Sequence, residues 1–175
     1  AAARGRVAEA LAKGDTAGAQ KLLAATPIGA AGGITYWESI RSCGFYPQET
    51  RLECVVDIHQ PNGYGGPVGS FGTFEYVSFY VDWQNNGFQP SDYVGSGIVH
   101  ITDGSAKTQF AVYRDFNPPG GPRTSNTGAT ANTTTNGPIY NVLARLSWAQ
   151  PVFVGCGNQV YGNDYQFRIR LMPVR

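Results

Sequence analysis

The sequence is poor in charge and in the residue types that build metal and nucleophilic centres. Only 14% of the residues are charged, the formal net charge is +1, and there are two histidines, three cysteines and one methionine. A protein that binds the nucleic-acid backbone needs a basic surface, so the near balance of charges argues against a nucleic-acid partner. No apolar run approaches the ~20 residues that span a bilayer, so we expect no transmembrane segment.

Glycine, proline and aromatic residues are abundant instead. The 175 residues include 23 glycines and 11 prolines, and 13% of the chain is aromatic. A chain of this length suffices for one domain with a substantial core and is short for two. Glycine and proline in these numbers favour many tight turns, and aromatic side chains bury large areas, so the composition favours an all-β protein.

Residues 1–33 differ in composition from the rest of the chain. They are rich in alanine, and within 3–27 the sizeable apolar side chains are Val7, Leu11, Leu22 and Leu23. Alanine, leucine, lysine and glutamine favour helix, and Asp15 is a candidate N-cap, so we expect short helices at 4–13 and 16–25. Helices this short are marginal in water, so this N-terminal helical arm needs another surface to lie against.

From residue 34 onward, apolar and polar residues alternate as they do in half-buried strands. In the first clear example Leu52, Cys54, Val56 and Ile58 would share one face, opposite Glu53, Asp57 and His59. Further strands are expected at 73–83, 93–102, 107–115, 139–149 and 165–172. Strands separated by Gly, Pro and Asn turns, with no helical period between them, predict an antiparallel β-sandwich or jelly roll over residues 34–175.

A set of short motifs runs through residues 36–172. They are Gly44, Pro47, Arg51-Leu52-Glu53, Val55-Val56 and Pro61; Gly63-Tyr64, Gly66, Glu75-Tyr76-Val77, Phe79-Tyr80 and Asp82; and Val99-His100, Leu146-Ser147-Trp148 and Gly162-Asn163. In these motifs the chain resembles a family of bacterial β-sandwich domains whose function is not established. The resemblance implies the sandwich and no catalytic residues. That family carries cysteines one place before Cys43 and near Gly69, so it implies no disulfide pairing here.

The three cysteines allow one disulfide and leave one thiol. Cys54 falls on the inward face of its strand, where it would serve as a small buried apolar residue. Cys43 and Cys156 both lie beside glycines in turn-like segments, so we expect the pair Cys43–Cys156 first and Cys43–Cys54 second. A disulfide favours an oxidising compartment, and the opening residues AAARGRV fit a chain whose leader was removed. We therefore expect an extracellular or cell-surface protein.

The residues that could hold a metal or transfer protons are few. The candidates for a metal site are Asp57, His59, His100 and Asp103. A catalytic zinc site needs three protein ligands that converge, and strand residues of this kind more often face water. The candidates for paired catalytic carboxylates are Glu38, Glu53, Glu75 and Asp82. Carboxylates on outer strand faces are usually solvated, and no G-x-S-x-G motif is present, so we expect no metal, no cofactor and no enzymatic activity.

One segment gathers aromatic side chains around a strand and the loop that follows it. The residues proposed as a glycan-binding face are Tyr76, Tyr80, Trp83 and Tyr93. Planar rings stack on sugar rings, and Asp82, Asn85 and Asn86 would supply hydrogen bonds. Rings of this kind also fill a core rim or cover an interface, so the pattern by itself leaves both interpretations open.

The whole sequence favours a secreted structural subunit that assembles with copies of itself. In this interpretation the arm at 1–33 docks on a neighbouring subunit, and a head-to-tail contact of that kind builds an extracellular filament unless it closes. The polar segment at 117–138 would line a subunit contact or decorate the outer surface. Two alternatives stay open: a carbohydrate-binding module that recognises a cell-surface polysaccharide, and a capsid-like jelly-roll shell protein.

Overall fold

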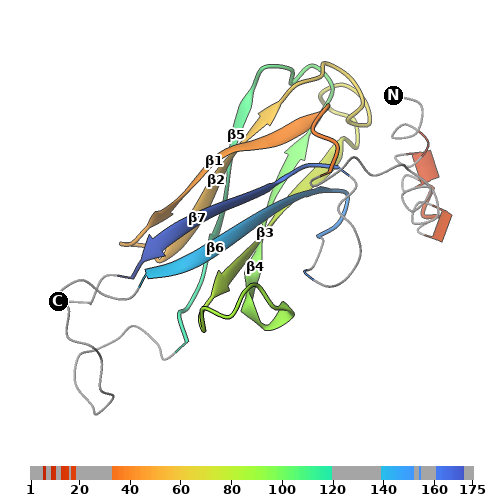
Figure 1. Cartoon of the computed structure of the whole chain (residues 1–175). Coiled ribbons are helices and arrows are strands. Elements are labelled where there is room, and N and C mark those ends of the chain that lie inside the picture. The colour runs from red at the N-terminus through yellow and green to blue at the C-terminus, as the bar shows by residue number, and fades with distance from the viewer. Residues whose placement is uncertain are drawn as a thin grey trace, which may run out of the picture.

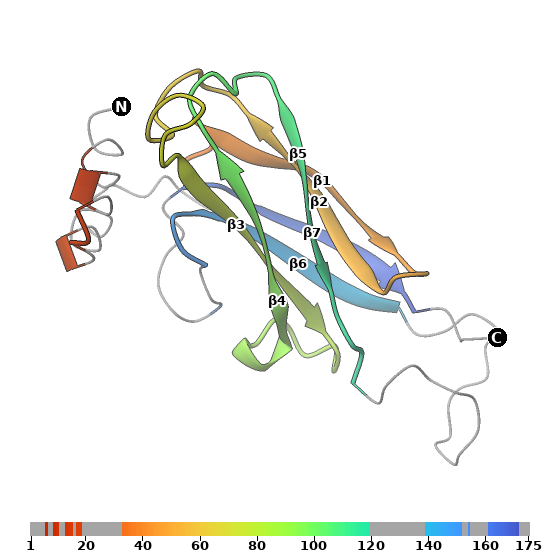
Figure 2. The ribbon, with the colours of Figure 1, turned by 180° about the vertical axis from the view of Figure 1, so that it is seen from behind.

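Two antiparallel sheets face each other in the computed structural model (Figures 1 and 2). The structure describes residues 6, 9–10, 13–15, 17–18, 33–119, 139–151, 154 and 161–171. The elements are β1 (Glu38–Tyr46), β2 (Arg51–Ile58), β3 (Thr73–Asp82), the 3₁₀ helix η1 (Pro90–Asp92), β4 (Tyr93–Ile101), β5 (Gln109–Asp115), β6 (Ile139–Trp148) and β7 (Asp164–Arg170). One sheet has the order β1-β2-β5 and the other the order β4-β3-β6-β7. The prediction of an all-β, antiparallel fold is confirmed.

The strand order is immunoglobulin-like. Lettered A to G along the chain, the sheets read A-B-E and D-C-F-G. Constant-type immunoglobulin domains have A-B-E-D facing C-F-G, so the difference is that the fourth strand pairs with the other sheet. A jelly roll has eight strands, whereas the described residues form seven. The result is a sandwich-like fold in which β4 lies beside β5 at one lateral edge and β1 lies beside β7 at the other.

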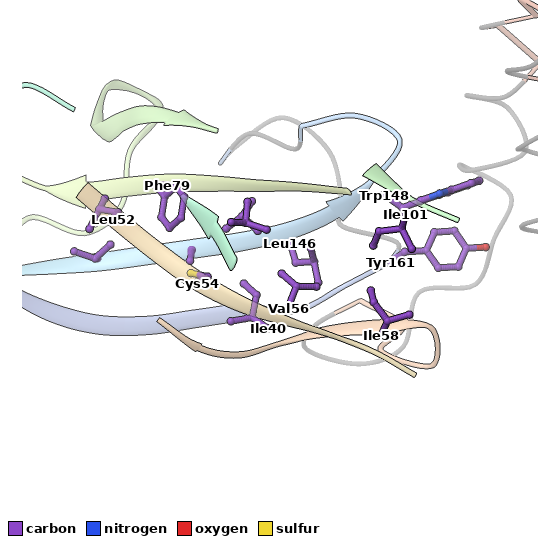
Figure 3. Packing of buried hydrophobic residues seen from close by; sticks show 14 of the residues in the cluster. Ile40, Leu52, Cys54, Val56, Ile58, Phe79, Ile101, Leu146, Trp148 and Tyr161 are labelled. Atoms are coloured by element: carbon purple, nitrogen blue, oxygen red, sulfur yellow. The ribbon is translucent and has the colours of Figure 1, made fainter. Parts of the chain in front are cut away.

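The core lies between the two sheets and follows from the alternation along the strands. The predicted inward residues of β2, which are Leu52, Cys54, Val56 and Ile58, are all buried. Phe79 of β3 and Leu146 of β6 are fully buried in the facing sheet (Figure 3). Burial of one such large apolar side chain contributes about 1.5–3 kcal/mol, so these layers hold the sheets together.

A bulge in β1 reverses the side-chain alternation along that strand. The register between β1 and β2 shifts between Ile40 and Ser42, which inserts Arg41 as an extra residue. A one-residue shift turns every later side chain to the other face. Ile40, before the bulge, and Cys43, after it, therefore both pack against the core.

The bulge also decides the disulfide. Cys43 lies directly opposite Cys54 on β2, the two Cα atoms are 4.0 Å apart, and the sulfur atoms are bonded. The preferred prediction of a Cys43–Cys156 pair is wrong, because the shift in alternation brings Cys43 to the face that carries Cys54. Cys156 lies outside the described residues. The bond closes a sequence separation of 11 residues, which corresponds to about 3 kcal/mol in the chain-entropy model.

The glycine- and proline-rich loop between β2 and β3 is held by one carboxylate. Asp103 Oδ1 accepts hydrogen bonds from the amides of Gly63 and Tyr64, at 2.9 and 2.8 Å. The Tyr64 hydroxyl, itself fully buried, donates to the Trp37 carbonyl at 2.6 Å. This loop is therefore anchored to the domain at both its backbone and its side chains.

The structure describes only a few residues of the predicted arm. The Lys13 amide donates to the Glu9 carbonyl at 3.1 Å, and Asp15 Oδ1 accepts from the Gly18 amide at 2.8 Å, as an N-cap side chain does. The half-buried Ala10 packs against the core cluster of its own chain. The four apolar residues predicted for the arm lie outside the described residues, namely Val7, Leu11, Leu22 and Leu23. Residues 120–138 of the polar segment lie outside them as well. The two helices stay a prediction.

Candidate functional site

A cleft lies where β5 ends and β4 begins, beside η1. Figure 2 shows the strands β4 and β5 that meet at this end of the domain. Its volume is about 360 Å³. Its aromatic lining residues are Trp83, Tyr93 and Phe116. Its polar lining residues are Ser91, Arg114, Asp115 and Asn117. Concave sites that combine aromatic walls with a few polar groups are typical ligand sites, so this cleft is the candidate functional site.

Trp83 forms one wall, and the turn after β3 holds it there. The buried Asp82 carboxylate accepts hydrogen bonds from the amides of Asn86 and Gly87, both at 3.1 Å. The Trp83 ring packs edge-on against Tyr140, with centroids 5.0 Å apart, and against Phe116 at 6.0 Å. The ring is thus fixed before any ligand arrives, which lowers the entropy cost of binding.

A second bulge lies at Tyr93, another lining residue of the cleft. In the pairing of β3 with β4, Phe79 lies opposite Gly95 but the next residue, Tyr80, lies opposite Tyr93, so Val94 is the extra residue. Bulges of this kind re-aim side chains next to functional sites. The Tyr93 ring lies 5.4 Å from the Tyr80 ring, and its hydroxyl is 2.8 Å from Ser96 Oγ.

The acidic group of the cleft is already paired. Arg51 of β2 donates to both oxygens of Asp115, at 2.7 and 3.2 Å, in the bidentate geometry that suits guanidinium and carboxylate. This hydrogen bond lowers the pKa of Asp115 below its ordinary value, and the charge of Arg114 adds to that effect. The Arg51 guanidinium also lies 4.2 Å from the centre of the Tyr113 ring.

Arg114 lies across β4 at a glycine. Gly95 has φ +131°, and a Cβ built there would overlap Arg114 Nε and lie 2.9 Å from Arg114 Cζ. Glycine inside a strand weakens it and often marks a close approach by another group. Here the approaching group is the Arg114 side chain, which crosses from β5 over the neighbouring sheet edge.

Two of the four residues predicted for a glycan face, Trp83 and Tyr93, reach this cleft. Tyr76 is half-buried on the outer face of β3, opposite Ile98. Tyr80 is 0% exposed, so it offers no ring face to a sugar and its assignment needs correction. The Val154 amide donates to the Tyr80 hydroxyl at 3.1 Å, and the Tyr93 ring packs against the Tyr80 ring.

The outward pair that ends β2, Asp57 and His59, makes surface contacts. Gln109 Nε2 donates to Asp57 Oδ1 at 2.9 Å, and His59 Nε2 is 2.9 Å from Ser39 Oγ. Asp57 thus contacts a residue of β5, and His59 contacts a residue of β1. The predicted outward face of β2 is confirmed.

The other two metal-site candidates support the loop between β2 and β3. His100 Nε2 contacts the Phe71 carbonyl at 2.8 Å, while Asp103 binds the loop amides described above. Within the described part of the chain, no three His, Cys, Asp or Glu side chains come together in a group that could hold a metal ion.

The carboxylates expected on outer strand faces lie mostly inside. Glu38 and Glu75 are 0% exposed, and Asp82 is 3% exposed. Glu75 shares its face of β3 with Val77 and Phe79, so strict alternation already places it inward. The expectation that these carboxylates are solvated is wrong. None of the three lines the cleft.

Comparison of the chain with protein-family models, curated proteins and solved structures finds no match. The resemblance to a bacterial domain family therefore stays a prediction. Of the helices within the described residues, none is both long enough and apolar enough to cross a membrane.

Sequence reasoning missed one aromatic residue of the cleft, Phe116, and its polar lining, which consists of Ser91, Arg114, Asp115 and Asn117. Phe116 could have been found, because it continues the inward alternation of Val112. Gly95 was a second signal, since an isolated glycine within a strand suggests a close approach. Neither signal identifies Arg114 as the residue that approaches Gly95, because that approach depends on which distant strands lie side by side.

Proposed function

We propose that this domain is an extracellular saccharide-binding module whose ligand lies in the cleft between β4 and β5. The observation that carries the proposal is the cleft lining, in which Trp83 and Tyr93 stand beside Ser91 and Asn117. Aromatic rings bury the apolar face of a sugar, while hydroxyl and amide groups bond its hydroxyls. The fixed geometry of Trp83 supports recognition without rearrangement.

Binding rather than catalysis suits the chemistry of the lining. Sugar hydrolysis needs two carboxyl groups that flank the bond to be cut. Among the described lining residues the one carboxylate is Asp115, and Arg51 holds both of its oxygens. A non-enzymatic role is accordingly part of the proposal, and the Cys43–Cys54 bond supports an oxidising compartment outside the cytoplasm.

The test is calorimetric titration of the full chain with soluble neutral and acidic polysaccharides, compared with Asn117→Ala and Trp83→Ala variants. Loss of either cleft side chain should weaken binding about tenfold or more, equivalent to ~1.4 kcal/mol. Trp83→Ala also removes ring packing, so its thermal unfolding is measured alongside, and Asn117→Ala supplies the variant with an intact core. Phe71→Ala, an exposed ring far from the cleft lining, is the matched control. The absence of binding to every polysaccharide would overturn the proposal.

A second function, assembly with copies of the same chain, is favoured by an exposed apolar patch. Phe71 and Val68 are 89% and 87% exposed, although the loop that carries them is anchored by Asp103. Ile98 and Phe74 continue the patch on the outer faces of β4 and β3, at 58% and 45% exposure. Apolar surface presented by an ordered segment is typical of interfaces. Because the net charge is small, like-charge repulsion does little to oppose close packing of copies.

Light scattering with negative-stain microscopy separates these functions. A Val68→Ser/Phe71→Ser double variant should remain monomeric at concentrations where the unaltered chain assembles. Tyr46→Ser, which changes an exposed ring on β1, serves as the control. Deletion of residues 1–33 tests the arm as connector: dispersed particles from the truncated chain and filaments or shells from the full chain would support it. Monomers of the unaltered chain at all concentrations would rule out both forms of assembly.

A further inference from the structure

The guanidinium of Arg114 is the one positive charge in the described lining of the cleft. The residue is exposed at the end of β5. With the part of the chain that the structure describes, Arg114 makes no ion pair and no side-chain hydrogen bond. All other charge at this end of the cleft is engaged: Asp115 is bound through both oxygens by Arg51. The guanidinium of Arg114 is therefore available to a ligand in the cleft, beside its aromatic lining residues.

The backbone of β4 leaves room for the Arg114 side chain. Gly95 adopts φ +131° and leaves room where a Cβ would overlap Arg114 Nε. Two residues on, a Cβ at Gly97 would lie 2.6 Å from the Tyr113 carbonyl oxygen, so β4 and β5 approach closely along this edge. Gly95 thus leaves space for the Arg114 side chain over β4, and the bulge at Val94 and Tyr93, two further lining residues of the cleft, lies directly beside it.

We propose that the cleft selects an acidic saccharide, and that Arg114 binds the carboxylate of a uronic acid residue. This inference rests on the proposed saccharide function and names the ligand class for the same cleft. A planar guanidinium matches a carboxylate through two parallel hydrogen bonds. In this arrangement the sugar ring lies along Trp83, and Ser91 and Asn117 bond ring hydroxyls.

The charge balance of the cleft favours this class over neutral and cationic sugars. Because Arg51 hydrogen-bonds both oxygens of Asp115, the guanidinium among the described lining residues that is open to a ligand carboxylate is that of Arg114. Asp92, the other acidic side chain beside the cleft, is 4% exposed, and its Oδ2 accepts a hydrogen bond from the Gln89 amide. Neither carboxylate is positioned to compete with a ligand carboxylate for Arg114.

The experiment titrates the full chain with an oligogalacturonate, with its fully methyl-esterified form and with a neutral oligosaccharide of equal length. The variants are Arg114→Gln, Arg114→Lys and, as matched control, Arg168→Gln, an exposed arginine of β7 outside the cleft lining. Arg114→Gln should weaken oligogalacturonate binding at least about tenfold, and methyl esterification should weaken binding to the unaltered protein by a similar factor. Arg114→Lys should fall between, because an ammonium keeps the charge without the fork.

The outcomes separate the two proposals. Equal affinity for the acid, the ester and the neutral oligosaccharide, with no effect of Arg114→Gln, would overturn the acidic ligand class and leave saccharide binding standing. Binding that Arg114→Gln and the control Arg168→Gln weaken equally, and that salt abolishes, would be nonspecific surface electrostatics. That result would also overturn the acidic ligand class. No binding of any of the three, with Trp83 and Asn117 variants equally inert, would overturn the saccharide function itself.

Discussion

The side chain of Asn163 bonds both backbone groups of Ile40, although Ile40 lies in the β1-β2-β5 sheet and Asn163 directly precedes β7 of the other sheet. The Ile40 amide donates to Asn163 Oδ1 at 2.6 Å, and Asn163 Nδ2 donates to the Ile40 carbonyl at 3.3 Å. The Asn163 carbonyl in turn accepts from the Leu146 amide of β6 at 3.0 Å. One amide side chain therefore acts as a strand partner for β1 at its bulge and joins the edges of the two sheets.

Replacement of Asn163 by alanine should lower the free energy of unfolding. Both backbone groups of Ile40 lose their partner at a part-buried site, which costs about 1–3 kcal/mol. Urea unfolding followed by tryptophan fluorescence measures the change, and the Ile40 amide should exchange with solvent faster. Gln166→Ala, an exposed change on β7, is the control. Equal stability of the two variants would show that water replaces the Asn163 amide without loss.

Peptide mapping of the non-reduced protein should recover a Cys43–Cys54 cross-link. Replacement of both cysteines by serine should lower the free energy of unfolding by about 3 kcal/mol, because the short loop is no longer closed in the unfolded chain. Cys156→Ser is the matched control and should leave the unfolding transition unchanged. A Cys43–Cys156 peptide would contradict the pairing and with it the bulge that sets the face of Cys43.

Acid should weaken the domain partly through Asp115. The hydrogen bond from Arg51 lowers the pKa of the folded-state carboxyl, so its contribution to stability is complete above the unfolded pKa of about 3.9 and is lost as the pH falls through the folded value. Thermal unfolding between about pH 6 and 2 should therefore decline less steeply for Asp115→Asn than for the unaltered protein. Arg51→Gln should flatten the curve in the same way. If the pH dependence of thermal unfolding were the same for the unaltered protein, Asp115→Asn and Arg51→Gln, this linkage would be contradicted.

The strands that alternate strictly were predictable, whereas the features that bulges create were not. The inward set of β2 follows from a period of two and appears in the structure as expected. β1 was missed because its bulge at Arg41 breaks the period and because a glutamate, Glu38, takes an inward position. The disulfide prediction went wrong at the same point, since one extra residue moves Cys43 from one face to the other.

The cleft depends on which distant strands come together, and local patterns carry little of that information. Trp83 and Tyr93 were identified from the density of aromatic residues near one strand. Arg114 enters because β5 crosses to lie beside β4, a contact between sheets that alternation does not predict. Tyr80 points outward as its strand position indicates, yet it is 0% exposed, and its hydroxyl accepts a hydrogen bond from the Val154 amide.

Gly95 and Arg114 should be coupled energetically. Gly95→Ala adds a Cβ at φ +131° and pushes against the Arg114 side chain, so we expect a loss of unfolding free energy of about 1–3 kcal/mol and weaker ligand binding. Gly87→Ala is the matched control: its φ is +90°, and nothing lies within 4 Å of the added Cβ, so it reports backbone strain alone. In a double-mutant cycle, Arg114→Ala should relieve part of the Gly95→Ala loss by about 0.5–3 kcal/mol, because contacting residues are not additive. Strict additivity, measured by denaturant unfolding of all four proteins, would show that Arg114 does not rest on this glycine.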